Sequence, residues 1–204
     1  MLNAINWIKN HKALIGTLSF IVLLAGGVTF AFFYQMKSLK VRSWEAIASA
    51  QIHASQGKTQ DAIGILRKIQ SQHTNRPLGY MATLYDASML TMSGNWKEAL
   101  IRYETVLSRT KKQEFTSWAL IGKAKSHEAM NELDKAKETY QTFVDSHSDH
   151  FLLPEAYEGL ARISEVQGKF NEAKENFERI RILFADTSWA QRAEIRLKQL
   201  GGTK

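Results

Sequence analysis

Two histidines and an aspartate form the closest group of residues that could do chemistry. His147, Asp149 and His150 offer imidazole and carboxylate ligands of the kind that zinc accepts. A stable metal site needs three or four ligands in fixed positions, whereas this group falls in a predicted joint between helices. We therefore interpret it as a solvated polar loop, with a labile surface metal site as the alternative. No metal site and no cofactor are predicted.

Two pairs of glutamates are the remaining candidates for general acid–base chemistry. Glu155 and Glu158, like Glu172 and Glu175, are three residues apart, which places each pair on one face of a helix. A solvated helix face explains them more simply. The sequence has no glycine-rich phosphate loop, no His-Glu-x-x-His motif, no nucleophile elbow and no cysteine. We predict that the protein is not an enzyme.

An uncharged apolar segment of 22 residues covers positions 13–34. As a helix it would be about 33 Å long, which is enough to cross a bilayer core of about 30 Å. We therefore predict a basic tail (1–12), a single transmembrane helix (13–34) and a basic juxtamembrane segment (35–42). The alternative is a cleaved signal peptide, whose apolar core would be only about 7–15 residues long and would end in a small-x-small site.

Basic residues lie on both sides of this segment, and residues 1–42 contain no Asp or Glu. The basic residues are Lys9, Lys12, Lys37, Lys40 and Arg42. The α-amino group adds a charge to the front flank, so the positive-inside rule does not decide the orientation. Residues 43–204 carry 22 Lys and Arg against 20 Asp and Glu, although the whole chain has a net charge of +7. A nucleic-acid-binding array would carry the excess itself, so no nucleic-acid partner is predicted.

A six-residue phrase occurs four times after residue 43. Its copies begin 37 residues apart, at Gly57, Gly94, Asn131 and Gly168. Each copy ends with an alanine that opens an amphipathic run, at Ala62, Ala99, Ala136 and Ala173. Glycine and asparagine adopt the left-handed conformation that ends a helix, so each unit is predicted to be helix, tight turn, helix. A fixed period in this range is typical of a stacked helical solenoid.

The predicted fold is therefore all-α, with one transmembrane helix followed by an α-solenoid of four helical hairpins over 43–186. The first helices are expected over 43–56, 80–93, 117–130 and 154–167, and the second helices over 59–72, 96–109, 133–146 and 170–184. A capping helix and tail are expected over 187–204, because an end unit would otherwise expose an apolar face.

The units resemble the tetratricopeptide repeat. The fourth unit matches best, through Tyr157, Leu160, Ala161, Gly168, Phe170, Ala173, Phe177 and Ile180. The second and third units have Asp86 and Lys123 where that family has leucine, and the period is 37 instead of the usual 34. The resemblance implies a concave groove, lined by the first helices, that holds peptide segments.

A second stripe of side chains on the first helices is the candidate protein-binding groove. It comprises Trp44, Ile47, Gln51, Met81, Leu84, Ser88, Trp118, Ile121, Lys125 and Arg162. An exposed apolar row is unfavourable unless something covers it, and it would suit an extended or helical segment. The alternative is that neighbouring helices cover the stripe and make it ordinary core.

The layout of basic tail, anchor and carboxyl-terminal array resembles the YfgM-like family of bacterial membrane proteins, the ancillary subunit of the Sec translocon. The resemblance implies a single-pass inner-membrane protein with a cytoplasmic amino terminus and periplasmic repeats. Its implied partners are the Sec translocon and polypeptide clients or periplasmic chaperones. We thus predict a membrane-anchored protein–protein interaction module. The alternative is a scaffold or self-associating assembly factor for another envelope machine, in division or secretion, which leaves a homo-oligomer open.

Overall fold

The computed structural model describes residues 24–30, 34 and 44–202. The predicted basic tail and flanks, with Lys9, Lys12, Lys37, Lys40 and Arg42, lie outside these ranges, as does most of segment 13–34. Residues 24–30 are helical. Across the ranges that the structure covers, none of the helices combines the length and the apolar character needed to cross a bilayer.

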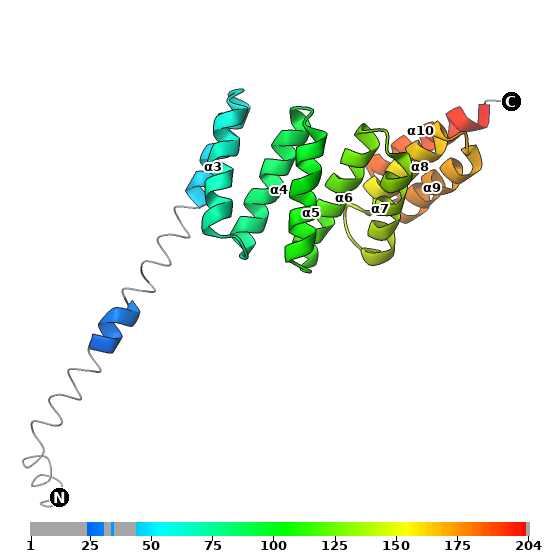
Figure 1. The fold of residues 1–204 in the computed structure, drawn as a ribbon. Coiled ribbons are helices and arrows are strands. Elements are labelled where there is room, and N and C mark those ends of the chain that lie inside the picture. The colour runs from blue at the N-terminus through cyan, green and yellow to red at the C-terminus, as the bar shows by residue number, and fades with distance from the viewer. Residues whose placement is uncertain (1–23, 31–33, 35–43, 203–204) are drawn as a thin grey trace, which may run out of the picture. The chain divides into compact units, whose positions relative to one another are not determined.

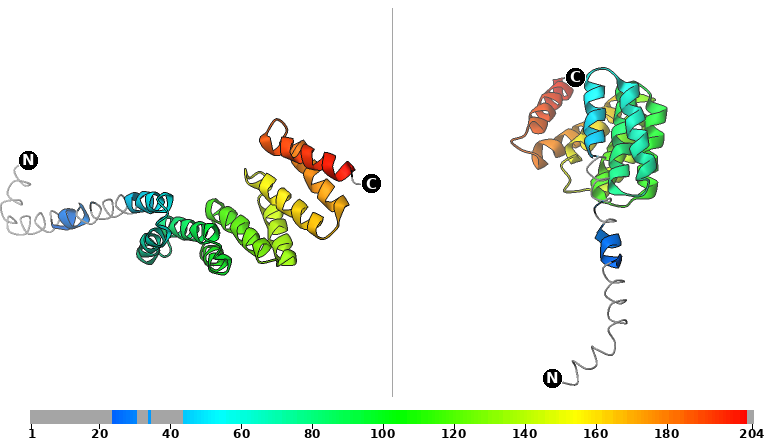
Figure 2. Two further views of the ribbon diagram at one scale, coloured as in Figure 1. Left: turned by 90° about the horizontal axis from the view of Figure 1, so that it is seen from above. Right: turned by 90° about the vertical axis from the view of Figure 1, so that its left-hand side faces the viewer.

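The chain divides into two compact units, Met1–Ala48 and Ser49–Lys204. In the second unit, successive helices form hairpins that stack in chain order (Figures 1 and 2). Residues 44–55 are helical. The following helices are α3 (Thr59–Gln72), α4 (Pro77–Met92), α5 (Trp96–Arg109), α6 (Gln113–Ala129), α7 (Leu133–Ser146), α8 (Leu153–Val166), α9 (Phe170–Leu183) and α10 (Ser188–Gly202). This helical solenoid confirms that part of the predicted fold class.

The turns inside the hairpins repeat one geometry. The φ angles of Gly57, Gly94, Asn131 and Gly168 are 79°, 75°, 61° and 72°. In the second hairpin, Gly94 N donates to Thr91 O at 3.0 Å and Asn95 N donates to Leu90 O at 2.8 Å. These two bonds form a Schellman motif, which satisfies carbonyl groups at the end of α4.

The first helices of successive hairpins also touch one another. Besides the contacts between sequence neighbours, α4 packs against α6, and α6 packs against α8. Close approach inside the hairpins is possible because the four phrase-ending alanines, Ala62, Ala99, Ala136 and Ala173, are fully buried. The array therefore has an inner layer of α4, α6 and α8, which is the layer that positions the candidate groove.

Two first helices begin earlier than the repeat period predicts. Helix α4 begins at Pro77 instead of residue 80, and α6 begins at Gln113 instead of residue 117. Pro77 stands in the first turn of α4, where its fixed φ favours the helix and its missing N–H costs nothing. The repeat period assigns every first helix the same start and cannot predict a start that depends on local residues. These two predicted boundaries are therefore wrong.

The last helix closes the core at the end of the array. Ala193 is buried, and Trp189, Leu197 and Leu200 pack against the core cluster that contains Phe177. Arg196 adds a charged contact between α10 and α8, with its Nη2 atom 2.6 Å from Glu165 Oε2. Helix α10 thus covers the apolar edge that the fourth hairpin would otherwise expose.

Candidate binding groove

A cavity of about 970 Å³ lies along the inner layer, lined by residues of α4, α5, α6 and α8. Its lining includes Trp118, which is 48% exposed, and Met92, which is 85% exposed, so the cavity opens to solvent. We call it the groove. Seven of the sequence-predicted residues line it: Met81, Leu84, Ser88, Trp118, Ile121, Lys125 and Arg162.

The other three predicted residues lie elsewhere. Trp44 and Ile47 belong to the unit that ends at Ala48, and neither they nor Gln51 lines the groove. The predicted row is also not exposed throughout, because Ile47 and Ile121 are each only 4% exposed. Ile121 belongs to the core cluster around Tyr140 and Phe143, so the helix turns most of this side chain inward.

Five large side chains of the groove were not among the predicted residues. They are Tyr85 and Met92 of α4, Trp96 and Tyr103 of α5, and Phe115 of α6. Trp96 is the first residue of α5. The repeat could have indicated this position, because two of the other copies of the phrase have a large apolar residue there, Leu133 and Phe170, and the remaining copy has Thr59. Tyr103 belongs to the buried stripe of a second helix, and its burial raises the pKa of the phenol. The wall thus takes aromatic side chains from both helices of the second hairpin.

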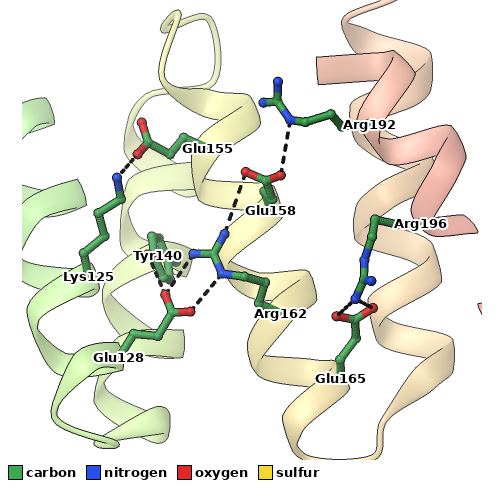
Figure 3. A network of polar contacts seen from close by, with 9 residues as sticks. All are labelled: Lys125, Glu128, Tyr140, Glu155, Glu158, Arg162, Glu165, Arg192 and Arg196. Atoms are coloured by element: carbon green, nitrogen blue, oxygen red, sulfur yellow. Dashed lines mark hydrogen bonds and ion pairs between the residues drawn. The ribbon is translucent and has the colours of Figure 1, made fainter. Parts of the chain in front are cut away.

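Charged residues at one side of the groove are tied into a network between α6 and α8 (Figure 3). Lys125 pairs with Glu155. Arg162 donates from Nε and Nη2 to the two carboxylate oxygens of Glu128, at 2.9 Å each. These hydrogen bonds raise the pKa of Arg162 further above its ordinary value. Both cations that line the groove are therefore neutralised by carboxylates.

Tyr140 of α7 also contacts this network. Its hydroxyl donates to Glu128 Oε2 at 3.0 Å (Figure 3). Burial, and next the negative charge of Glu128, raise the pKa of Tyr140 well above its ordinary value. The phenol consequently stays protonated and holds Glu128 in the orientation that meets Arg162 in a bidentate pair.

Comparisons with known proteins agree with this geometry. A family model described as tetratricopeptide repeat matches residues 118–150. The array has the tetratricopeptide-repeat fold. A crystal structure of a tetratricopeptide repeat protein from Parabacteroides merdae ATCC 43184 is 21% identical with a TM-score of 0.64, over 78% of this chain and 60% of that chain. The chain thus spans 60% of the length of that protein.

A second solved structure has the same fold. The nearly identical TPR-like repeats from Podosopora anserina are 18% identical to this chain, with a TM-score of 0.61, over 78% of this chain and 85% of that chain. No curated protein sequence matches the chain. At these identities the likeness establishes the tetratricopeptide-repeat fold and leaves the binding partner to be inferred from the groove.

The two charged residues that replace leucine in the tetratricopeptide-repeat pattern, Asp86 and Lys123, form ion pairs between helices. Asp86 is fully buried, and its Oδ2 accepts from Arg102 Nε at 2.8 Å and from Gln70 Nε2 at 3.1 Å. Lys123 Nζ lies 3.0 Å from Glu104 Oε1. Where this fold usually packs a leucine, ion pairs join neighbouring helices, because α5 presents Arg102 to α4 and Glu104 to α6.

The histidine group in the joint after α7 is not the solvated loop that the sequence indicates. His147 is 5% exposed and stacks on Phe143, with ring centroids 4.7 Å apart. His150 stacks on Phe151, which contacts Trp118 edge-on at 5.6 Å. The aromatic neighbours thus cover the two imidazole rings, whereas Ser148 and Asp149 between them are exposed. Across the described ranges, no three potential ligands stand close enough to hold a metal ion.

Proposed function

We propose that this protein is a membrane-anchored interaction module that binds polypeptide segments in its groove, as an accessory of the bacterial Sec translocon or of periplasmic chaperones. Tetratricopeptide repeats generally mediate protein–protein interaction, and the fold is typically a non-enzymatic scaffold. The observation that carries the proposal is the open groove of about 970 Å³ with Trp118 half exposed in its wall. Large apolar side chains at a solvent-exposed concave surface are typical of a binding site.

The anchor is the second part of the proposal, and its support comes from the sequence of segment 13–34. Within that segment, the apolar side chains of Leu24, Val28 and Phe30 are 53%, 66% and 73% exposed. The one hydroxyl on this stretch, from Thr29, is satisfied within the helix by Ala25 O at 2.9 Å. Exposed apolar side chains and a self-satisfied hydroxyl suit a lipid environment. Tethering would raise the local concentration of the array beside a membrane complex.

The orientation is proposed from the resemblance in layout, with the amino terminus in the cytoplasm and the repeats in the periplasm. Because the chain has no cysteine, single cysteines at Asn3 and Thr203 can be labelled with a membrane-impermeant maleimide in intact cells. We expect Thr203→Cys to react after outer-membrane permeabilisation alone, and Asn3→Cys to react only after lysis. The reverse pattern would exclude a periplasmic array.

The partner is tested by crosslinking membranes with a short reagent and isolating the full-length protein in mild detergent. We expect Sec subunits or periplasmic chaperones to be recovered with the native protein in excess over a matched single-pass membrane protein. Recovery at the level of that control would contradict the Sec assignment.

A scaffold that self-associates is the second candidate, and a different surface favours it. Ile182 and Leu183 at the end of α9 and Ile195 on α10 are 65%, 58% and 56% exposed. Native mass spectrometry of the full chain in detergent distinguishes the two candidates. A stable oligomer that dissociates in the Ile195→Asp variant would support the scaffold. A monomer at all concentrations would exclude self-association and leave polypeptide binding in the groove as the candidate function.

A further inference from the structure

We infer that the occupant of the groove is an apolar polypeptide segment flanked by lysine or arginine, and not a segment that ends in acidic residues. The inference rests on the proposed function, since it specifies which polypeptides the same groove takes. It follows from which charged side chains of the lining already have an ion-pair partner.

The cations of the groove are not available to a ligand carboxylate. Arg162 is held by both oxygens of Glu128 at 2.9 Å, and Glu158 Oε2 lies 3.7 Å from its Nη1. Lys125 is occupied by Glu155. An acidic ligand would have to displace carboxylates that the protein already holds in place, and it would leave these displaced groups unpaired.

Carboxylates are in surplus on the same lining. Among the described residues, the lining has three carboxylates (Glu114, Glu128 and Glu155) and two cations (Lys125 and Arg162), although the chain as a whole carries a net charge of +7. Glu114 is exposed at the start of α6, and no ion pair to it occurs within residues 44–202. A ligand cation beside Glu114 would therefore gain a partner without breaking an existing pair.

The middle of the groove selects the apolar part of the ligand. Met81, Leu84 and Met92 of α4 stand in the lining together with Trp118 of α6. Methionine side chains are flexible and polarizable, so such a wall adapts to apolar segments of different sequence. The exposed ring of Trp118 also offers a face to a lysine or arginine of the ligand. Shape and charge together favour an apolar stretch with a basic end.

Three labelled peptides test the inference against the full-length protein in phosphatidylcholine nanodiscs, with empty nanodiscs as the blank. The peptides share one apolar stretch and differ in its flank, which is lysine, serine, or glutamate with a free carboxyl terminus. By fluorescence anisotropy at low salt, we expect the lysine peptide to bind about fivefold more tightly than the serine peptide, and the glutamate peptide to bind most weakly. High salt should reduce the differences.

Two variants locate the effect. Glu114→Gln should remove most of the preference of the groove for the lysine peptide over the serine peptide. Glu175→Gln, which alters an exposed glutamate on α9 outside the groove, should leave the preference intact. Tightest binding of the glutamate peptide would overturn the inference while leaving polypeptide binding in place. Binding of no peptide above the blank would overturn the inference together with the proposed function.

Discussion

The ring of Tyr103 lies against Gly122, so closely that a Cβ atom at Gly122 would stand 2.2 Å from Tyr103 Cζ. Thirty-seven residues later, the Tyr140 ring lies on Gly159 in the same way, with a Cβ only 2.4 Å from its Cζ. Each pair joins the second helix of one hairpin to the first helix of the next. The tyrosine–glycine contact therefore sets the spacing between hairpins, and Tyr103 and Gly122 also line the groove.

Replacing Gly122 with alanine should force the Tyr103 ring to move. We expect Gly122→Ala to lower the free energy of unfolding by about 1–3 kcal/mol, since overpacking a tight interface costs about that much. Urea unfolding in detergent, followed by circular dichroism, measures it. The matched control is Gly64→Ala on α3, where a Cβ meets nothing within 4 Å and helix propensity should add up to about 1 kcal/mol. Equal effects of the two substitutions would contradict the spacing role.

The buried charge of Asp86 gives a second prediction. Asp86→Leu restores the residue usual in this fold but leaves Arg102 without its 2.8 Å partner. Because the Arg102 side chain is 27% exposed, we expect a loss of about 3 kcal/mol, at the low end for a broken buried pair. The double variant Asp86→Leu with Arg102→Met should recover most of that loss. A double variant as unstable as the single one would show that the charge pair is not the reason.

Acid sensitivity is expected in the joint between α7 and α8. Burial lowers the pKa of both His147 and His150. The positive charge of His147 lowers the pKa of His150 further, whereas the negative charge of Asp149 raises both pKa values and so opposes these shifts. The unfolded chain therefore takes up protons first, so stability should be full above the ordinary histidine pKa of about 6.5 and should fall as the pH drops below it. The loss should cease once the folded histidines also become protonated.

Unfolding free energies between pH 7.5 and pH 5.5 measure this dependence, in a window where carboxylates remain ionised. His147→Phe keeps the stacking on Phe143 and removes one titrating group, so its stability should depend less on pH. An unchanged slope in that variant would place the acid sensitivity elsewhere.

Trp118 and Trp44 form a natural matched pair for the groove. They are 48% and 44% exposed, but only Trp118 lines the groove. We expect Trp118→Ala to weaken binding of the serine-flanked apolar peptide about tenfold or more, as for a central aromatic anchor. Trp44→Ala should leave it within about twofold. Similar losses in both variants would argue for nonspecific adhesion to exposed rings.

The repeat architecture was predictable because it depends on local conformation. Gly57 and Asn131 predict left-handed turns independently of tertiary packing, and the second helices begin at the residues that the phrase predicts. The groove was only partly predictable. Helical spacing places Ile121 on the same stripe as Trp118, but which of the two is covered depends on the packing of the neighbouring hairpin. The pairing of Asp86 with Arg102 likewise requires two helices to be placed side by side first.

We expect the groove, and not the rest of the inner surface, to contact polypeptides in the membrane-bound state. A photo-crosslinking amino acid at Ser88, exposed in the groove, tests it directly, with Gln51, exposed outside the groove, as the control position. We expect polypeptide adducts from Ser88 that are lost with Trp118→Ala, and few adducts from Gln51. Adducts of equal yield from both positions, or from neither, would contradict it.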